Sequence, residues 1–164
     1  KAIKHLTENY SKEDVRLFLI DLKQTAFLRY NNVIYDLEKA KSVLNDLVNK
    51  INAEVEKEER PTIIIVDECC ELLFDCETLS LLKTFAAKGR AINALLILST
   101  QMFAPDVLVR ELKANLQTRV CFPVADIDDS FLIVHEEGAE KLSVGEFLYC
   151  SPYSDGIKRY KVKW

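Results

Sequence analysis

The chain has 164 residues, of which 49% are apolar and 29% charged, as is usual for one soluble globular domain. Its 26 acidic and 22 basic residues give a net charge of −4, which excludes nucleic-acid binding through bulk charge, so any DNA contact must be local. No apolar run reaches the ~18 residues of a membrane span, and five cysteines without metal-ligand spacing indicate a reducing compartment. We therefore expect a cytoplasmic protein whose present segment makes no membrane contact.

Short apolar runs alternate with segments of helical periodicity along the chain. In chain order they predict a strand over Val15–Asp21, a helix over Asp36–Lys57 with Asp36 as N-cap, a strand over Thr62–Asp67, a helical stretch over Glu68–Phe74, and a helix over Leu79–Ala87 that Gly89 caps. They then predict a strand over Ala94–Thr100, a helix over Asp106–Ala114 capped by Asp106, a strand over Thr118–Val124, a helix within Ser130–Leu142 that breaks at Gly138, and a hairpin of Gly145–Cys150 with Gly156–Trp164. Apolar strands separated by helices are typical of a mostly parallel sheet covered on both faces, so we expect an α/β fold in one domain over residues 1–164.

Two adjacent acids close the second strand. The apolar run Ile63–Val66 followed by Asp67 and Glu68 forms a Walker B pattern of the kind that P-loop ATPases use. Asp67 would hold the Mg²⁺ shell, because a hard dication takes oxygen ligands, and Glu68 would orient or deprotonate the attacking water. A strand that ends in a solvated acidic turn is the alternative interpretation.

Polar residues also follow the third strand. Ser99, Thr100 and Gln101 place hydroxyls and a carboxamide where a γ-phosphate sensor belongs, one strand beyond the two acids. Ligand groups gather at the carboxyl ends of parallel strands, so we expect Asp67, Thr100 and Gln101 to contact ATP and Mg²⁺ together. This interpretation requires the acids and Gln101 to be neighbours.

Longer segments carry a family resemblance. DVRLFLIDLK over Asp14–Lys23 resembles a strand that ends in IDPK, and IIIVDE over Ile63–Glu68 resembles a Walker B strand. Further resemblances lie in KGRAINALLILSTQ over Lys88–Gln101, DVLVRELKANLQTRVCFPV over Asp106–Val124, and GAEKL with GEFLY over Gly138–Tyr149. Together these segments resemble the FtsK/SpoIIIE DNA translocases of the HerA–FtsK group of P-loop motors.

The resemblance implies a RecA-like P-loop NTPase core, a hexameric ring, and ATP hydrolysis coupled to movement along double-stranded DNA. By position, Asp67 and Glu68 match the Walker B pair and Gln101 matches the sensor glutamine. Arg90 and Arg119 match two family arginines, each of which would reach a neighbouring subunit's nucleotide or form an ion pair. The strand residues that flank Arg119 favour its structural role.

The chain also departs from the family pattern. It contains no G-x-x-x-x-G-K-[ST] loop, and Lys1–Tyr10 matches the later part of the helix that follows this loop. We therefore expect a truncated motor domain, without its N-terminal strand and P-loop, that does not bind ATP tightly by itself. Phe131 stands in place of a family arginine that would act between subunits.

The predicted DNA contact is Met102–Lys113, with Arg110 and Lys113 as phosphate ligands. A protein-secretion ATPase of the EssC/EccC type is an alternative, because it shares the motor fold, although the KANxxTR and GAEKL segments look closer to DNA translocases. A catalytically inactive structural ring module is a third interpretation. The retained Asp67, Glu68 and Gln101 argue against inactivity, and Phe131 argues for it.

Overall fold

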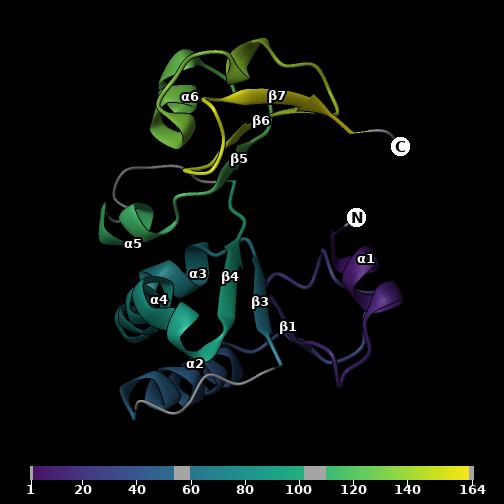
Figure 1. Ribbon diagram of the computed structural model, residues 1–164, viewed down its shortest axis with the longest axis vertical. Coiled ribbons are helices and arrows are strands. Elements are labelled where there is room, and N and C mark those ends of the chain that lie inside the picture. Colours follow the sequence, from purple (N-terminus) through teal and green to yellow (C-terminus); the bar gives the residue numbers. More distant parts are fainter. Residues whose placement is uncertain (1, 54–59, 102–109, 163–164) are drawn as a thin grey trace. The chain divides into compact units, whose positions relative to one another are not determined.

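The computed structural model describes residues 2–53, 60–101 and 110–162. The chain divides into two compact units, residues 1–102 and 103–164, and each has its own sheet (Figure 1). The single domain expected over the whole chain stays a prediction. Within the described ranges, no helix has the length and apolar character that crossing a membrane would require.

The first unit is built on a four-stranded parallel sheet with the strand order β2–β1–β3–β4. Its strands are β1 (Arg16–Asp21), β2 (Val33–Ile34), β3 (Thr62–Asp67) and β4 (Ala94–Leu98). The register pairs Asp21 with Asp67 and Val66 with Leu98, so the carboxyl ends of β1, β3 and β4 lie at one edge of the sheet. The predicted strands at these places are confirmed, whereas the two-residue β2 was not predicted.

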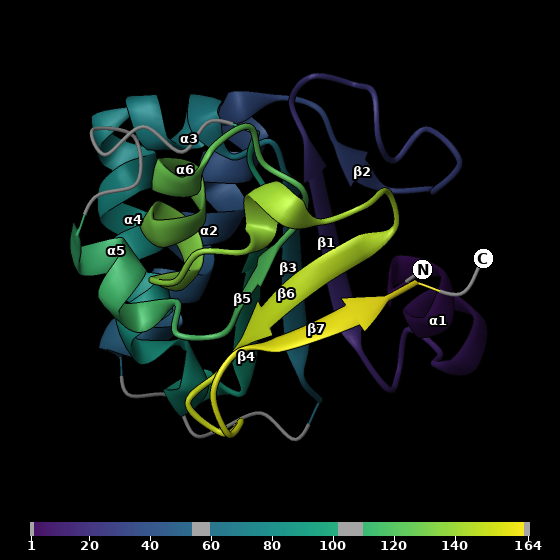
Figure 2. The same cartoon turned by 90° about the horizontal axis from the view of Figure 1, so that it is seen from above.

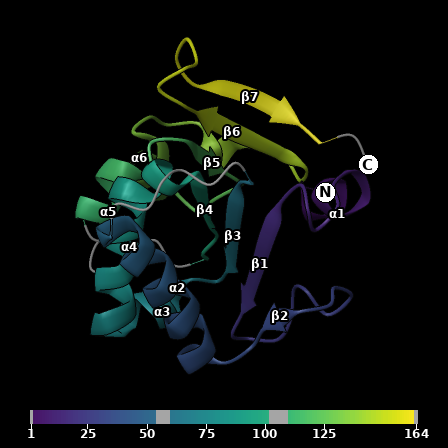
Figure 3. The ribbon, with the colours of Figure 1, turned by 60° about the horizontal axis from the view of Figure 1, so that its bottom comes forward.

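Helices cover both faces of this sheet, as expected for apolar parallel strands. Figures 1 and 3 show α2 (Leu37–Asn52) and α4 (Cys76–Lys88) on one side and α1 (Ala2–Asn9) on the other. On the α1 side, Ile3 and Leu6 pack against a buried cluster that contains Leu19, Phe27 and Ile65. On the other side, the alternate strand residues are almost fully buried, among them Ile20, Ile64 and Val66. Both faces of the sheet are therefore covered at β1 and β3.

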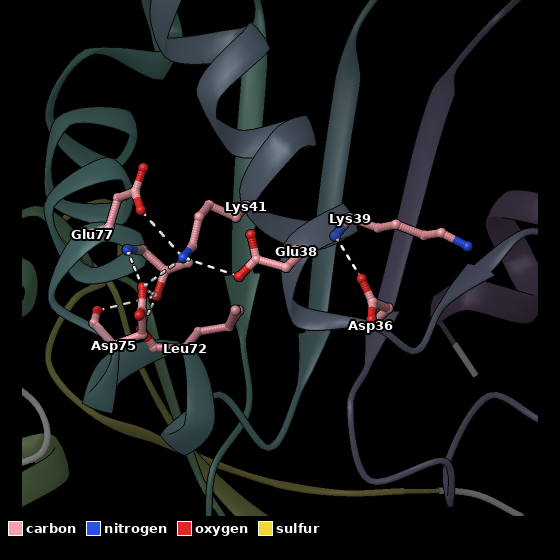
Figure 4. A network of polar contacts seen from close by, with 8 residues as sticks. Asp36, Glu38, Lys39, Lys41, Leu72, Asp75 and Glu77 are labelled. Atoms are coloured by element: carbon pink, nitrogen blue, oxygen red, sulfur yellow. Dashed lines mark hydrogen bonds and ion pairs between the residues drawn. The ribbon is translucent and has the colours of Figure 1, made fainter.

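A charged cluster joins α2 to α4 (Figure 4). The ammonium group of Lys41 lies 3.2 Å from Oε1 of Glu38, 3.2 Å from Oε2 of Glu77 and 3.6 Å from Oδ1 of Asp75. Both helices also begin at capping aspartates, because Asp36 accepts from the Lys39 N–H and Asp75 from the Thr78 N–H. The predicted N-cap of α2 is confirmed, and α4 begins earlier than its apolar spacing indicated.

Gly89 follows α4 as predicted, but its backbone is not left-handed, with φ at −55°. A Cβ atom at this position would lie 3.2 Å from the carbonyl oxygen of Ala94 and 3.4 Å from the ring of Phe85. The glycine therefore permits a close approach of α4 to the start of β4. The left-handed turn is made instead by Asn93, with φ at 56°.

The edge strand β4 carries exposed apolar side chains. In the part of the chain that the structure describes, β4 pairs with β3 alone. Leu95 and Ile97 point to the same face and are 55% and 46% exposed. Their register partners on β3, Ile63 and Ile65, pack in the cluster under α1. The apolar face is thus covered at β1 and β3 and open at β4.

The second unit contains an antiparallel sheet with the order β5–β6–β7. Its elements are α5 (Arg110–Asn115), β5 (Arg119–Cys121), α6 (Ile127–Val134), β6 (Glu146–Cys150) and β7 (Lys158–Lys161). Ile133 and Val134 of α6 are buried in one core cluster with Leu148. On the outer face the ring of Phe147 stacks on that of Tyr160, with 5.5 Å between centroids. The predicted hairpin is confirmed, and Figure 2 shows β6 and β7 as its arms.

The predicted bounds of α6 differ from the observed ones, and only part of α5 is described. The helix expected to begin at Ser130 begins at Ile127, because Asp126 caps it by accepting from the Asp129 N–H at 2.9 Å. It ends at the left-handed His135, before Gly138 is reached. The predicted cap Asp106 lies outside the described residues, where α5 is described from Arg110 onward.

Candidate functional site

The loops that follow β3 and β4 are tied together at the carboxyl edge of the first unit's sheet. The Ser99 N–H donates to the carbonyl of Val66 at 3.0 Å, and the Cys69 N–H donates to the carbonyl of Ser99 at 2.8 Å. These bonds continue the β3–β4 pairing past the ends of both strands. The two predicted acids and the predicted sensor residues consequently lie on neighbouring loops.

Asp67 is the last residue of β3 and is half-buried. The hydroxyl of Ser99 donates to its Oδ1 at 2.9 Å and so orients the carboxylate. The predicted metal ligand is thus held by a residue that follows the neighbouring strand.

Glu68 is almost completely buried, with 4% of its surface exposed. The hydroxyl of Thr100 donates to Oε1 at 2.8 Å, and the N–H of Gln101 donates to Oε2 at 3.0 Å. The expected contact between the acids and the third strand is therefore present. The backbone of Glu68 is left-handed, with φ at 49°, so the helical stretch predicted to begin here starts only at Cys70, as α3 (Cys70–Phe74).

Lys23, in the loop after β1, completes the surroundings of Glu68. Its ammonium group lies 3.7 Å from Oε2 of Glu68 and its side chain is 46% exposed. Burial raises the pKa of Glu68, but hydrogen bonds from Cys70, Thr100 and Gln101 and the charge of Lys23 together hold this pKa below its ordinary value. The carboxylate is therefore ionised at neutral pH although it is buried.

Asp21 ends β1 next to Asp67 and is fully buried. Its Oδ2 accepts from the backbone N–H groups of Thr25, Ala26 and Phe27 at 2.9–3.1 Å. Burial raises the pKa of Asp21, and these backbone donors outweigh that effect and lower the pKa overall. The other oxygen, Oδ1, is buried without a hydrogen-bond partner in the described structure.

The donor atoms at this edge fit Mg²⁺. They are hard oxygens: the Asp67 carboxylate, the Ser99 hydroxyl and the unpartnered Oδ1 of Asp21. Among the described residues there is no group of three or more His, Cys, Asp or Glu side chains that could hold a metal. Mg²⁺ takes one or two carboxylates and completes its shell with water and phosphate, so the Asp67 carboxylate would suit it.

The cysteines beside the acids do not form a reactive pair. All five are free thiols, and burial, assisted by Cys70 and Glu68, raises the pKa of Cys69 to about 12. The Cys70 sulfur lies 3.2 Å from the Thr100 hydroxyl, so it packs against the polar network around Glu68.

Comparison of the sequence with known proteins identifies relatives that match half or more of this chain. The chain is 30% identical to the DNA translocase FtsK of Leptospira interrogans serogroup Icterohaemorrhagiae serovar copenhageni over an alignment of 195 positions, which covers 96% of this chain and 20% of that protein. It is 38% identical to the DNA translocase FtsK of Borreliella burgdorferi over 92 residues, which covers 54% of this chain and 12% of that protein. The chain belongs to the FtsK/SpoIIIE family. No protein-family model matches the sequence.

Solved structures agree with this family assignment at the level of fold. The pCW3 conjugation coupling protein TcpA, in its monomer form with ATPγS, matches with a TM-score of 0.79 at 21% identity over 92% of this chain and 52% of that one. The cytoplasmic domain of the Thermomonospora curvata type VII secretion ATPase EccC matches with a TM-score of 0.73 at 18% identity over 99% and 23%. The fold is the RecA-like fold of P-loop ATPase domains. The chain spans about a fifth or less of the length of its FtsK relatives.

The remaining residues assigned from the FtsK/SpoIIIE resemblance lie elsewhere. Arg90 is exposed and precedes β4, so it lies at the amino-terminal edge of the sheet, opposite Gln101. Arg119 belongs to the second unit, where its guanidinium donates to backbone carbonyls of Lys113, Leu116 and Ile133. Their catalytic roles stay predictions.

The predicted DNA contacts differ from each other in exposure. Arg110 is exposed at the start of α5, whereas Lys113 is half-buried, with its ammonium group 3.5 Å from the carbonyl oxygen of Leu132. Burial and the nearby Arg119 lower the pKa of Lys113. Residues 102–109 of the predicted DNA-contacting segment lie outside the described structure.

The sequence places Lys23, with Asp21, among the polar residues that follow strand ends and suggest a phosphate and metal site, but it does not predict the ion pair with Glu68. The place of Lys23 two residues after Asp21, at the end of the strand next to β3, is the feature that would have indicated this pair. The left-handed backbone of Glu68, in contrast, has no counterpart in the residue pattern, because a glutamate carries no left-handed preference.

Proposed function

We propose that this chain carries the Walker B and sensor part of an ATP-hydrolysing motor that moves double-stranded DNA. The observation that carries the proposal is the bond network of Glu68, whose carboxylate accepts from Thr100 and from the Gln101 N–H. These bonds unite the paired acids with the sensor strand in one site. Membership of the FtsK/SpoIIIE family supports the same assignment.

In the proposed reaction, Asp67 would hold Mg²⁺, which would supply positive charge to the phosphates of ATP. Ser99 fixes the carboxylate of Asp67 through its hydroxyl. Glu68 orients the attacking water or accepts its proton, as a buried but ionised base. Gln101 follows the sensor strand with an exposed side chain that can face the γ-phosphate.

These 164 residues contain no G-x-x-x-x-G-K-[ST] motif, so the proposed motor needs a phosphate-binding loop that they do not provide. Within the described residues β4 pairs with β3 alone, which supports this part of the proposal, since a further strand can pair at its other edge and the helix after that strand can cover Leu95 and Ile97. We expect the complete polypeptide, and not this segment, to bind ATP tightly.

Movement along double-stranded DNA and assembly into a hexameric ring are the finer parts of the proposal. They are supported by the names of the relatives, which are DNA translocases. Arg110, exposed on α5, is the better-placed phosphate ligand, and Lys113 the weaker one. Arg90, which is exposed, is the better-placed arginine to act on a neighbouring subunit's nucleotide, whereas the bonds of the Arg119 guanidinium to three backbone carbonyls favour a structural role for Arg119.

Polypeptide export is the second candidate function. It is favoured by the similarity of this fold to type VII secretion ATPases, including a Thermomonospora curvata EccC structure in complex with a signal sequence peptide, at a TM-score of 0.76 and 14% identity. The higher sequence identity to DNA translocases favours DNA as the substrate. The bonded Asp67 and Glu68 argue against a third candidate, an inactive structural ring module.

ATP hydrolysis by the full-length protein tests the proposal. We expect Mg²⁺-dependent hydrolysis that duplex DNA stimulates and that Glu68→Gln lowers by about 10²–10⁴-fold, the usual loss of a general base. Stimulation by a secretion-signal peptide and not by DNA would favour export. Unchanged hydrolysis in Glu68→Gln would refute the assigned role of this site.

A further inference from the structure

A cavity of about 510 Å³ lies in the first unit, where residues of α1, of the loop that follows it, of β1 and of the loop before β2 line it. Arg60, which precedes β3, completes the lining. The paired acids and Gln101 do not line the cavity, so it is separate from the proposed ATP site. Small-molecule sites have volumes of about 300–1,000 Å³, and this cavity therefore has the size for a ligand of its own.

The buried part of this lining is apolar. Leu6 and Tyr30 pack against the core cluster that contains Leu19, and Leu19 itself lines the cavity. The ring of Tyr30 makes an edge contact with the ring of Phe27, with 6.5 Å between centroids. Tyr10, which is 47% exposed, supplies a second ring. Nucleobases stack on aromatic side chains, so the cavity suits a ligand that has a flat ring.

The polar part of the lining is positively charged. Four cationic residues contribute to it: Lys12, Arg16, Arg29 and Arg60. Among the described lining residues there is no aspartate or glutamate, although the chain has 26 acidic residues against 22 basic ones. A guanidinium group offers paired N–H donors that match the oxygens of a phosphate. The charge of the cavity therefore favours an anion, and its arginines favour a phosphate group.

Hydrogen bonds hold Arg60 in place and engage a nearby acid. The guanidinium of Arg60 donates to the backbone carbonyl of Lys12 at 2.8 Å, which ties the segment before β3 to the loop before β1. The carboxylate of Asp14 accepts from the N–H and from the hydroxyl of Ser11, both at 2.8 Å. Arg60 is thus fixed at the cavity, and Asp14 is bonded within its own turn.

We propose that this cavity binds a nucleotide. The base lies against the rings of Tyr10 and Tyr30. The phosphate lies among the cationic groups of Lys12, Arg29 and Arg60. The ligand is a free nucleotide or the phosphorylated end of a nucleic-acid strand, because both present a base next to a phosphate. The inference goes beyond the proposed hydrolysis of ATP and does not depend on the roles of the paired acids.

Adenosine monophosphate is a suitable probe, because it lacks the β- and γ-phosphates that P-loop motors bind. In the full-length protein, we expect it to slow hydrogen exchange over residues 10–17 and 29–32, which contain most of the lining. Isothermal titration calorimetry measures its affinity. A short phosphorylated oligonucleotide is the second ligand. Tighter binding of the oligonucleotide than of adenosine monophosphate would identify a strand end as the source of the nucleotide, and weaker binding would identify a free nucleotide.

Two variants test the two parts of the cavity. Arg29→Glu should weaken the binding of adenosine monophosphate about ten- to a hundredfold, the effect of losing one hydrogen bond to a charged group. Arg29 is exposed, so this variant should fold. Tyr10→Leu removes a ring and keeps an apolar side chain, and it should weaken binding about fivefold or more. Lys39→Glu is the control, because it makes the same kind of charge change at an exposed position of α2 outside the cavity.

An absence of binding, or an unchanged affinity in Arg29→Glu or in Tyr10→Leu, would overturn the inference. Slower exchange confined to the segments around Glu68 and Gln101 would overturn it as well, because adenosine monophosphate would then occupy the proposed ATP site alone. Inorganic phosphate is the last control. If it binds this cavity as tightly as adenosine monophosphate does, the tyrosine rings take no part and the ligand is not a nucleotide.

Discussion

The hydroxyl of Thr100 donates a hydrogen bond of 2.8 Å to Oε1 of Glu68 and so connects the end of the sensor strand to a carboxylate that is only 4% exposed. A buried carboxylate that loses a donor keeps its full desolvation cost, so such bonds matter more than surface hydrogen bonds. The polar network at the strand ends therefore contributes to folding as well as to the proposed chemistry.

Thr100→Val should lower the free energy of unfolding by about 1.5–3 kcal/mol, because it removes a hydrogen bond to a charged, buried group while keeping the side-chain shape. Thr100→Ser keeps the hydroxyl and should recover most of this loss. Urea unfolding of the three proteins measures the difference. Equal stability of Thr100→Val and the wild type would show that the bond to Glu68 does not stabilise the fold.

Acidification should destabilise the first unit through Asp21. The pKa of Asp21 is lowered in the folded state, so its contribution is present above the unfolded value of about 3.9 and is lost as the pH falls through the folded pKa. Asp21→Asn should be less stable at neutral pH, because a neutral amide replaces the acceptor of three N–H bonds. Its stability should also change less than that of the wild type below pH ~4.

Thermal unfolding monitored between pH ~2 and ~6 measures the Asp21 effect across the range in which aspartate titrates. Asp46→Asn is a matched control, because Asp46 is exposed on α2 of the same unit. A pH dependence that is identical in Asp21→Asn and the wild type would contradict the prediction.

Removing the charge of Lys41 should lower Tm, because Glu38, Asp75 and Glu77 would then repel one another between α2 and α4. Lys41→Met is the appropriate variant, and Lys39→Met is its control, since Lys39 is exposed and Figure 4 shows its ammonium group directed away from the cluster. Differential scanning calorimetry at low salt should separate the two variants. Added salt should reduce the difference through screening, and a salt-independent loss would point to packing instead.

Arg119→Lys should destabilise the second unit, because a lysine ammonium cannot reproduce the forked contacts of a guanidinium with three backbone carbonyls. The expected loss is about 1–3 kcal/mol, the cost of leaving buried acceptors unpaired. Arg110→Lys, at an exposed position of α5, should leave stability unchanged. Native-state hydrogen exchange of β5 and α6 amides measures the effect in this unit specifically.

Much of the first unit could be predicted from the sequence, because its strands are continuous apolar runs and its acids stand at their ends. Thr62–Asp67 is a strand over the predicted range, and Asp36 is the N-cap of α2 as predicted. The neighbourhood of Glu68 and Gln101 was also predictable, since parallel strands bring their carboxyl ends together. Sequence order and hydrophobic pattern were sufficient for these features.

Other features depend on contacts that no local pattern contains. β2 has two residues and exists through its pairing with Leu19 and Ile20 of β1. The bonds of Glu68 to Thr100 and Lys23 join three strand ends that are far apart in sequence. Gly89 caps α4 as the sequence predicts, but its close approach to the carbonyl oxygen of Ala94 can be recognised only from the packing. Tertiary geometry decides these cases.

Among the described residues, the outer edge of β4 has no pairing strand, and this has a practical consequence for work with these 164 residues alone. An unpaired strand that displays Leu95 and Ile97 is a template on which a strand of another molecule can add, the reaction that begins aggregation. Solutions of these 164 residues should become turbid or self-associate as they are concentrated, and Leu95→Lys or Ile97→Lys should prevent this.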